Sequence, residues 1–453
     1  MTEFDALIIG AGQAGPSLAE RFTQAGMTVA LVERKLVGGT CVNAGCIPTK
    51  TLVASARAAH VARCAAQWGV ITGPVTVDMK AVRARANAVA RQARLNVETW
   101  LGTMPGLTLL RGHARLEGGG RVRIGDQVIS APRIFLNVGA RPVMPPLPGL
   151  ADITALDSTD MLQLETVPRH LVVVGGSYIG LEFAQMHRRF GAAVTVIERA
   201  ARLIPREDED VSTSVADILR AEGIDIRTGV SEIGFAPHPA GALVLADGAP
   251  IQASHVLVAT GRRPNTDDLG LDTAGVAVDA RGYVTVDEAL RTNVPGLWAL
   301  GDCNGRGAFT HTAYNDFEIV AANVLDGASR RVSDRIPAYA LYIDPPLGRV
   351  GMTEAEARAS GRRLLLSKRP MSRVGRAVER GETQGFIKVV ADEESGQILG
   401  AAILGIEGDE AIHGILDAMH AGTPHAVLRW AVPIHPTVSE LIPTVLGDLR
   451  PAG

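Results

Sequence analysis

Two cysteines separated by four residues, Cys41 and Cys46, form the pair in this sequence with the clearest capacity for chemistry. Two thiols take up or release two electrons by breaking or forming a disulfide. In a regular helix, residues five apart have Cα atoms about 8–9 Å apart, whereas a disulfide tolerates about 4.4–6.8 Å. We therefore expect a break at Gly45 and a helix that starts near Cys46, with Pro48 in its first turn.

A cysteine at the start of a helix has a stabilised thiolate, so we expect Cys46 to have a lowered pKa. The alternative is a structural or metal-bound pair. The chain contains four cysteines and no second pair with the spacing that a zinc site would need. The sequence therefore favours a redox-active pair.

A glycine-rich turn precedes this pair. Gly10, Gly12 and Gly15 follow a predicted strand and open a predicted helix, which matches the G-x-G-x-x-G fingerprint in its required context. Such glycines let the backbone approach a pyrophosphate, and the helix N-terminus attracts its charge. Glu33 ends the next predicted strand, where an acidic side chain binds ribose hydroxyls. These features predict a dinucleotide-binding unit.

The same pattern recurs later in the chain. Gly175, Gly176 and Gly180 lie between a predicted strand and helix, and Glu198 follows the next strand. The last glycine and the acidic residue are eighteen positions apart in both copies (33 − 15 and 198 − 180). Ser177 stands where the middle glycine is expected, which makes the second match less complete.

Two dinucleotide-binding units imply two nucleotides. Because the dithiol lies beside the first unit, we expect FAD there and a nicotinamide cofactor in the second. Glu198 favours NADH, since a carboxylate binds the ribose 2′-hydroxyl, whereas Arg199 and the nearby Arg202 favour the 2′-phosphate of NADPH. We expect use of NADPH or of both cofactors.

The remaining patterns define the expected organisation. Pro-rich residues 142–149 leave the first unit, residues 262–265 return to it, and a change of pattern near Ile336 begins a third region. Helices are predicted over residues 79–100 and 410–421. The expected fold class is α/β, with two Rossmann-like domains for FAD and NAD(P) and a C-terminal α+β domain. The expected limits are 1–147 with 264–335 for FAD, 148–263 for NAD(P), and 336–453 for the last domain.

Composition excludes several classes of function. The 453 residues carry a net charge of −3 and 4% aromatic residues, which argues against nucleic-acid binding. The sequence shows neither a signal peptide nor an apolar run of membrane-spanning length. Four cysteines in such a chain point to the reducing cytoplasm, where a disulfide is usually catalytic.

Together these motifs resemble the class I pyridine nucleotide–disulfide oxidoreductases, which include glutathione reductase, dihydrolipoyl dehydrogenase and mercuric reductase. The resemblance spans essentially the whole chain. It is carried by residues 38–50, both glycine fingerprints, Gly301-Asp302, and the C-terminal residues His435 to Glu440. Residues 344–353 and 183–185 look closest to mercuric-reductase-like flavoproteins. The resemblance implies that the C-terminal domain forms a homodimer.

The resemblance also implies roles for the residues of the redox site. Cys46 matches the flavin-proximal sulfur that forms a thiolate–flavin charge-transfer pair, and Cys41 matches the interchange thiol that attacks substrate. Lys50 matches a lysine near flavin N5, with Glu182 as its ion-pair partner.

Two residues near the C-terminus complete the implied catalytic set. His435 and Glu440 match an acid–base dyad that the family inserts into the neighbouring subunit's site. The histidine would take the proton of Cys41 and return it to the leaving thiol, and the glutamate would orient and charge-stabilise the imidazole.

The implied cofactor contacts follow from the same motifs, and no metal site is expected. Tyr178 matches an aromatic gate over the nicotinamide pocket. The residues expected to contact FAD are Gly10, Gly12, Gly15, Glu33, Arg34, Gly39, Thr40, Lys50, Gly139, Gly301 and Asp302. Those expected to contact NAD(P) are Gly175, Gly176, Tyr178, Ile179, Gly180, Glu198, Arg199 and Gly261.

The acid–base dyad favours a small disulfide or thiol-bound acceptor as substrate. No cysteine follows Cys303, although familiar mercuric reductases carry a C-terminal pair. Reduction of mercuric or copper ions and dihydrolipoyl dehydrogenase activity stay as alternatives. Outside this class, a redox sensor would show a damaged cysteine pair or dyad, and an NAD(P)H oxidase would consume oxygen without a disulfide.

Overall fold

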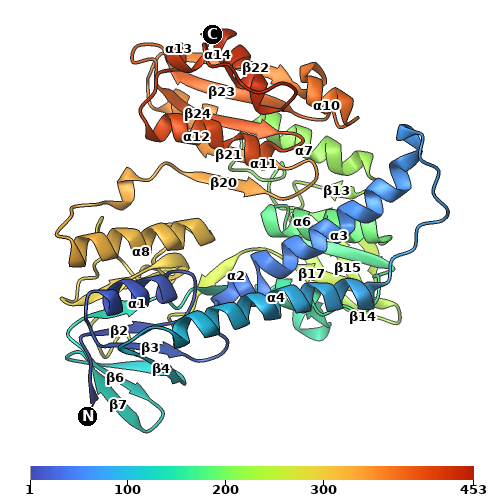
Figure 1. The fold of residues 1–453 in the computed structure, drawn as a ribbon. Coiled ribbons are helices and arrows are strands. Elements are labelled where there is room, and N and C mark those ends of the chain that lie inside the picture. Colours follow the sequence, from blue (N-terminus) through green and yellow to red (C-terminus); the bar gives the residue numbers. More distant parts are fainter. Residues whose placement is uncertain (1, 453) are drawn as a thin grey trace.

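Two parallel five-stranded sheets form the lower and right-hand parts of the computed structural model, which describes residues 2–452 (Figure 1). The first sheet has the order β19-β8-β2-β3-β4, and its central strands are buried on both faces, as parallel strands covered by helices usually are. Its strands are β2 (Ala6–Ile9), β3 (Val29–Glu33), β4 (Leu107–Arg111), β8 (Ile134–Leu136) and β19 (Leu297–Ala299).

The second parallel sheet repeats this arrangement. Its order is β10-β17-β11-β12-β13, so β17, β11, β12 and β13 correspond to β8, β2, β3 and β4. Its strands are β10 (Ala155–Leu156), β11 (His170–Val174), β12 (Ala193–Ile197), β13 (Asp225–Arg227) and β17 (His255–Val258). The helices α1 (Ala14–Gln24) and α6 (Tyr178–Phe190) follow the two glycine turns. The predicted pair of Rossmann-like units is confirmed.

A small sheet accompanies each unit. The first carries β5 (Ala114–Gly118), β6 (Arg121–Ile124) and β7 (Gln127–Ser130), with β1 (Thr2–Glu3) at the edge. The second carries β14 (Ile233–His238), β15 (Gly241–Ala246) and β16 (Ala249–Ala253). All strand pairs in both small sheets are antiparallel except β1 with β7, which is parallel.

The chain leaves the first unit and returns to it at adjacent positions. Strand β9 (Ala140–Pro142) pairs in antiparallel register with β18 (Arg262–Pro264), so the outgoing and returning segments lie side by side. The second unit is thus inserted into the first through a two-stranded connection.

The C-terminal part is a six-stranded sheet in the order β20-β21-β24-β23-β22-β25. All its pairings are antiparallel, which fits the predicted α+β domain. The helix predicted over 410–421 starts earlier and is interrupted at Ile412, giving α11 (Gly408–Ala411) and α12 (His413–His420). The strands are β20 (Ala338–Leu341), β21 (Leu347–Gly351), β22 (Leu364–Pro370), β23 (Phe386–Asp392), β24 (Ile398–Leu404) and β25 (Arg450–Pro451).

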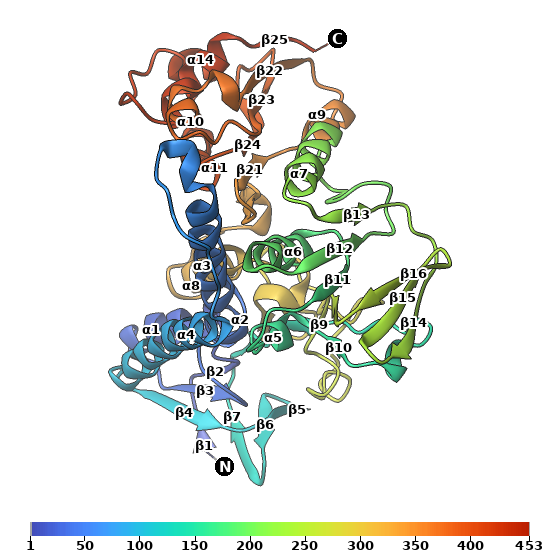
Figure 2. The ribbon, with the colours of Figure 1, turned by 90° about the vertical axis from the view of Figure 1, so that its right-hand side faces the viewer.

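Two long helices connect these parts. Helix α3 (Cys46–Cys64) runs from the first unit up to the C-terminal sheet, as both views show (Figures 1 and 2). Helix α4 (Met79–Gly102) packs beside it and starts at Asp78, whose carboxylate accepts a hydrogen bond from Ala81 N at 3.1 Å. The helix predicted over 79–100 is confirmed. Within residues 2–452 no helix is both long and apolar enough to cross a membrane.

The turn at Gly15 yields a test of the first nucleotide-binding unit. A Cβ atom at Gly15 would lie 2.3 Å from Gly10 O, so Gly15→Ala must move the turn apart. Such overpacking costs about 1–3 kcal/mol, and we expect FAD affinity to fall on the order of tenfold or more. The measurement is the flavin absorbance of purified protein relative to its protein absorbance.

Gly102→Ala is the matched control, because no atom lies within 4 Å of the added Cβ. Equal flavin content in both variants would contradict the role of this turn.

Candidate active site

The redox pair lies where α2 (Gly39–Ala44) meets α3, at the inner end of the long helix. Gly45 separates the two helices with φ −137° and ψ −122°. A Cβ atom there would lie 2.8 Å from Thr40 O and 3.2 Å from Cys41 Cα, so only glycine fits without a shift. This break brings Cys41 and Cys46 into side-chain hydrogen-bond contact and confirms the predicted geometry.

The surroundings of Cys46 favour its thiolate. A hydrogen bond from the Cys41 thiol lowers the pKa of Cys46 to about 6, against the opposing effect of burial. The Thr310 hydroxyl, 3.4 Å from Cys46 Sγ, and the positive charge of Lys50 act in the same direction. At neutral pH the pair therefore has a negative sulfur at Cys46.

Cys41 has the opposite character. Its pKa is raised far above the usual thiol range because its proton is hydrogen-bonded to Cys46, because it is partly buried, and because a neighbouring thiolate repels a second negative charge. The reduced pair thus carries one charge and one proton, each on a defined sulfur. An external base is needed before Cys41 can act as a nucleophile.

The predicted Lys50–Glu182 pair forms and joins the two Rossmann-like units. Lys50 Nζ lies 2.5 Å from Glu182 Oε2, with Lys50 on α3 and Glu182 on α6. Glu182 Oε1 also accepts a hydrogen bond from Tyr342 N at 3.0 Å, and Lys50 Nζ lies 4.4 Å from the centre of the Tyr342 ring. A lysine charge is thereby held near Cys46.

The first glycine turn has the shape that a pyrophosphate needs. Gly10 has φ +106°, and a Cβ atom there would lie 2.3 Å from Asn137 O. A Cβ atom at Gly39, at the start of α2, would lie 2.8 Å from Gly12 Cα. The turn and the start of α2 therefore meet backbone to backbone. These residues fit the pyrophosphate of FAD.

The acidic residues of both units are held in the same way. Glu33 accepts hydrogen bonds from Ala11 N (2.9 Å) and Lys35 N (2.7 Å). Glu198 accepts them from Gly176 N (2.7 Å) and Ala200 N (2.8 Å). Each carboxylate keeps free lone pairs for the two hydroxyls of a ribose.

The second turn accommodates its unexpected serine. Gly175 has φ +116°, and a Cβ atom at Gly180 would lie 2.0 Å from Gly175 O, as at the equivalent glycines of the first unit. Ser177 has φ −114°, a conformation that any residue adopts, so glycine is not required there. The residues of this turn fit a second dinucleotide.

The other predicted cofactor residues lie around these two turns. Thr40 is in the first turn of α2 and Ile179 is the second residue of α6. Gly139 and Gly261 both have positive φ, +66° and +137°, beside the paired crossings. Gly301, with φ +70°, opens the short helix that carries Asp302.

Charged residues at these sites have local partners. Arg34 pairs with Asp268 at 3.3 Å, and Asp302 lies 3.7 Å from Arg262. Burial raises the pKa of Asp302. Arg199 is exposed.

The histidine–glutamate dyad is formed, and its histidine is exposed. His435 Nδ1 lies 2.8 Å from Glu440 Oε2, while the His435 side chain is 78% exposed and that of Glu440 only 14%. Among the described residues, no hydrogen bond or ion pair joins the dyad to Cys41 or Cys46. The structure therefore leaves the other ring nitrogen, Nε2, directed outward.

Exposed apolar side chains precede this dyad in the sequence. Val427, Trp430, Val432 and Ile434 are 62%, 75%, 96% and 80% exposed. Contiguous exposed apolar surface of this kind usually marks a protein–protein interface.

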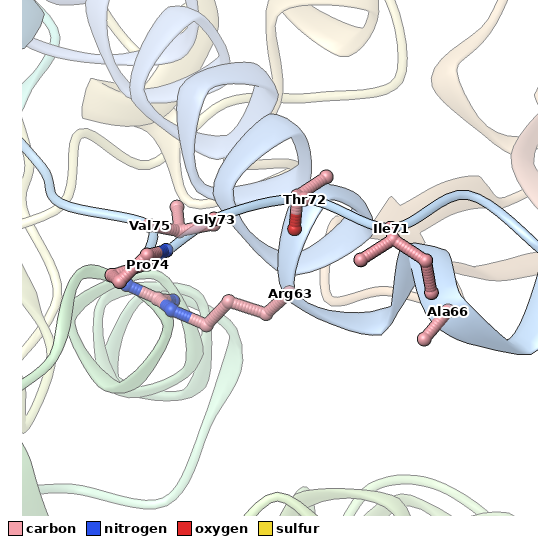
Figure 3. Close-up of a pocket in the computed structure, with 7 residues that line it drawn as sticks. All are labelled: Arg63, Ala66, Ile71, Thr72, Gly73, Pro74 and Val75. Carbon is pink, nitrogen blue, oxygen red and sulfur yellow. The ribbon is translucent and has the colours of Figure 1, made fainter.

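A surface pocket at the far end of α3 is separate from the redox site. Figure 3 shows it beside Arg63, Ala66 and residues 71–75. Arg63 is seventeen residues after Cys46 in one helix, which places it about 25 Å away. No group of three or more His, Cys, Asp or Glu side chains suited to a metal ion occurs in residues 2–452.

The other two cysteines do not join the pair. Cys303 is fully buried, and burial raises its pKa to about 12. Cys64 Sγ lies 3.8 Å from His60 Nε2 at the outer end of α3.

Three residues of the site escape the sequence patterns. Thr310 contacts Cys46 across 264 positions of sequence, Asn137 Nδ2 donates to Gly10 O at 3.2 Å, and Tyr342 covers Lys50. Only Asn137 could have been found from the sequence, because it directly follows β8, the strand that lies beside β2 and ends next to the glycine turn at Gly10.

A dithiol held between two dinucleotide-binding units defines a two-nucleotide redox enzyme. The family model described as pyridine nucleotide-disulphide oxidoreductase matches residues 4–316, and the model of its dimerisation domain matches residues 337–446. The chain belongs to the pyridine nucleotide-disulphide oxidoreductase family. It is an NAD(P)H-dependent flavin disulfide oxidoreductase whose cofactors are FAD and NAD(P)H, and the dimerisation domain supports a homodimer.

Individual relatives agree with this assignment. The chain is 36% identical over 449 residues to the probable pyridine nucleotide-disulfide oxidoreductase RclA of Escherichia coli, covering 97% of this chain and 98% of the relative. It is 34% identical over 424 residues to a mercuric reductase of Acidithiobacillus ferrooxidans, covering 90% of this chain and 76% of the relative. A solved Cu(II) complex of the HOCl-induced flavoprotein disulfide reductase RclA from Escherichia coli superposes with a TM-score of 0.91 at 35% identity, covering 99% of both chains.

The lowered pKa of Cys46 predicts a pH dependence. Since that pKa is about 6, below the ordinary thiol value, the thiolate is present above about pH 6 and is lost as the pH falls through it. In the two-electron-reduced protein, the long-wavelength thiolate–flavin absorbance is expected to disappear over this range. Thr310→Val should move the midpoint upward by about one to two pH units, because a hydrogen bond to a charged group contributes about 1.5–3 kcal/mol.

Cys46→Ser is the control for this titration and should lack the band at every pH. An unchanged midpoint in Thr310→Val would contradict the role of the threonine.

Proposed function

We propose that this enzyme reduces a small disulfide or thiol-bound acceptor at the Cys41–Cys46 pair. The observation that carries the proposal is the division of charge and proton between the two sulfurs: Cys46 is the stable thiolate and Cys41 keeps its proton. Such a division suits a pair in which one sulfur stays beside the flavin and the other attacks the substrate. Bound FAD supplies two-electron transfer between NAD(P)H and these sulfurs.

The thiol chemistry needs a base at Cys41, and we propose that the dyad of a second chain provides it. His435 Nε2 takes the proton of Cys41, and Glu440 holds the imidazole through Nδ1. The Cys41 thiolate then attacks one sulfur of the acceptor, and His435 protonates the leaving thiol. The support for a second chain is the exposure of His435 and of the apolar side chains that precede it in the dimerisation domain.

The second half of the reaction releases the other thiol. The Cys46 thiolate attacks Cys41 in the mixed disulfide, so the Cys41–Cys46 disulfide forms as the second substrate sulfur leaves. The second leaving sulfur takes a proton from solvent, so one acceptor disulfide becomes two thiols, and NAD(P)H restores the enzyme pair as one thiolate and one thiol. Lys50, held by Glu182, keeps a positive charge near Cys46 and so favours its thiolate form whenever the pair is reduced.

The domain limits proposed from the sequence suit this scheme. We propose 1–147 with 264–335 as the FAD domain, 148–263 as the NAD(P) domain and 336–453 as the dimerisation domain. The dithiol, which must be reduced again after each turnover, fits the reducing cytoplasm.

NADH is the electron donor that the second nucleotide site supports better. The Glu198 carboxylate is fixed by two backbone N–H groups at the expected ribose position, where it would repel a 2′-phosphate. Arg202 is engaged with the carbonyls of Pro205 (3.2 Å) and Glu207 (3.1 Å), which leaves Arg199 as the exposed arginine nearby. Unlike the sequence, which leads us to expect NADPH or both cofactors, these contacts lead us to propose that NADH is used in preference to NADPH.

Metal-ion reduction is the second candidate function. A thiolate beside a thiol binds soft metal ions, and two similar proteins are named for mercuric ion or solved with Cu(II). The two functions differ in their need for a proton: release of a substrate thiol requires one, whereas reduction of a bound metal ion does not.

An acceptor panel in the wild type and in His435→Gln separates the two functions. With NADH as donor, kcat/KM for small disulfides is expected to fall by about 10²–10⁴-fold in the variant, because a general acid–base residue contributes that much. NADPH serves as the comparison donor. Reduction of Cu(II) and Hg(II) is expected to change little. A wild type that reduces metal ions and no disulfide would contradict the first function.

The second-chain dyad predicts complementation between two inactive variants. Cys41→Ser and His435→Gln homodimers are each expected to be inactive toward disulfides, but a mixed dimer contains one site with an intact cysteine pair and an intact dyad. Random exchange of subunits should restore about a quarter of wild-type activity, as twofold symmetry requires. The measurement is disulfide reductase activity after co-refolding or co-expression, and no recovery in verified mixed dimers would place the dyad within its own subunit.

A further inference from the structure

Three side chains donate hydrogen bonds to one buried carboxylate, Glu207, in the second nucleotide-binding unit. Glu207 Oε1 accepts hydrogen bonds from Tyr178 Oη (3.1 Å) and Tyr339 Oη (2.7 Å). Glu207 Oε2 accepts two from Arg349, from Nε at 3.0 Å and from Nη2 at 2.6 Å. The side chains of Glu207 and Arg349 are 0% and 1% exposed, so water does not compete for these bonds.

The carboxylate is fixed from the C-terminal sheet. Tyr339 on β20 and Arg349 on β21 are directly paired in the antiparallel register, which places their side chains on the same face. Arg349 Nη2 also lies 3.2 Å from Asp208, and Lys388 lies 3.3 Å from the same aspartate. Glu207 therefore has little freedom to turn away.

Tyr178 is the member of this group that lies at the second nucleotide site. It is the first residue of α6, directly after the glycine turn of the second nucleotide site, and its ring packs edge-on against Tyr339 with centroids 5.6 Å apart. Glu182, one helical turn later on the same face, reaches Lys50 and Tyr342. Tyr178 and the Lys50–Glu182 pair are thus on the same side of α6, one helical turn apart.

The hydrogen bonds around Glu207 do not satisfy every buried polar atom. Arg349 Nη1 is buried and has no hydrogen-bond partner among residues 2–452, which is a cost for a fully buried guanidinium. An apolar contact at this place would hold the sheet to α6 without that cost. Two charged groups and a tyrosine hydroxyl instead give the ring of Tyr178 one defined direction.

We propose that Glu207, held by Arg349, is a positioning residue that keeps the Tyr178 ring against Tyr339 and out of the space that the nicotinamide ring needs. The inference rests on the proposed nicotinamide site of the second unit and adds a determinant of cofactor binding to it. Without this anchor, the ring turns into the space beside Lys50 and Glu182 and competes with the nicotinamide, but not with the adenosine half of the cofactor.

Binding of two ligands to the FAD-loaded protein, measured by calorimetry, tests the proposal. NAD⁺ contains the nicotinamide ring, and ADP-ribose lacks it. Tyr178→Phe removes the anchoring hydrogen bond and Glu207→Gln weakens it, so NAD⁺ should bind about tenfold more weakly in both, while the affinity for ADP-ribose stays as in the wild type.

A double variant tests whether the Tyr178 ring is the group that competes with the nicotinamide. In Tyr178→Ala, the further change Glu207→Gln should leave NAD⁺ affinity unaltered, because no aromatic ring is left to turn inward. Tyr339→Phe, which removes one donor to the same carboxylate, is the milder variant if Glu207→Gln does not fold, and it should weaken NAD⁺ alone by a smaller factor.

The proposal is overturned if Glu207→Gln weakens NAD⁺ and ADP-ribose equally, or if it has the same effect with and without Tyr178, since both results describe a purely structural residue. Unchanged NAD⁺ affinity in Tyr178→Phe also overturns it. A wild-type protein that binds neither ligand contradicts the nicotinamide site itself, which is a separate failure of the proposed function.

Discussion

The hydrogen bond between Cys41 and Cys46 is the interaction on which the rest of the site depends. It assigns the negative charge to one sulfur and the proton to the other, and Thr310 and Lys50 reinforce the assignment. The contact exists because Gly45 lets α2 end and α3 begin within one residue. The ion pair of Lys50 with Glu182 then links this arrangement to the second nucleotide-binding unit.

Much of the fold could be predicted because its signals are local. Glycines at turns, the acidic residues Glu33 and Glu198, and the strand–turn–helix context lie within short segments, and both copies show them. Ser177 looked like a defect only because the pattern counts residue types. The backbone there has an ordinary negative φ, so the turn does not depend on a glycine at that position.

Other parts of the site could not be predicted because they come from tertiary contacts. Thr310 reaches Cys46 and Tyr342 reaches Lys50 from elements far along the chain, and no spacing connects them. The break at Ile412 was missed since the apolar pattern continues through both helices. Glu207 belongs to the same group: a carboxylate in a run of charged residues looks solvated until β20 and β21 cover it.

The paired crossings β9 and β18 bear on the history of the molecule. Because the two segments that enter and leave the second Rossmann-like unit are hydrogen-bonded to each other, the ends of that unit are neighbours. A gene segment coding for it can therefore be gained or lost in one event without pulling apart the host sheet. The two Rossmann-like units have matching strand orders. Duplication of an ancestral nucleotide-binding module, followed by insertion of one copy into the other, would produce this match.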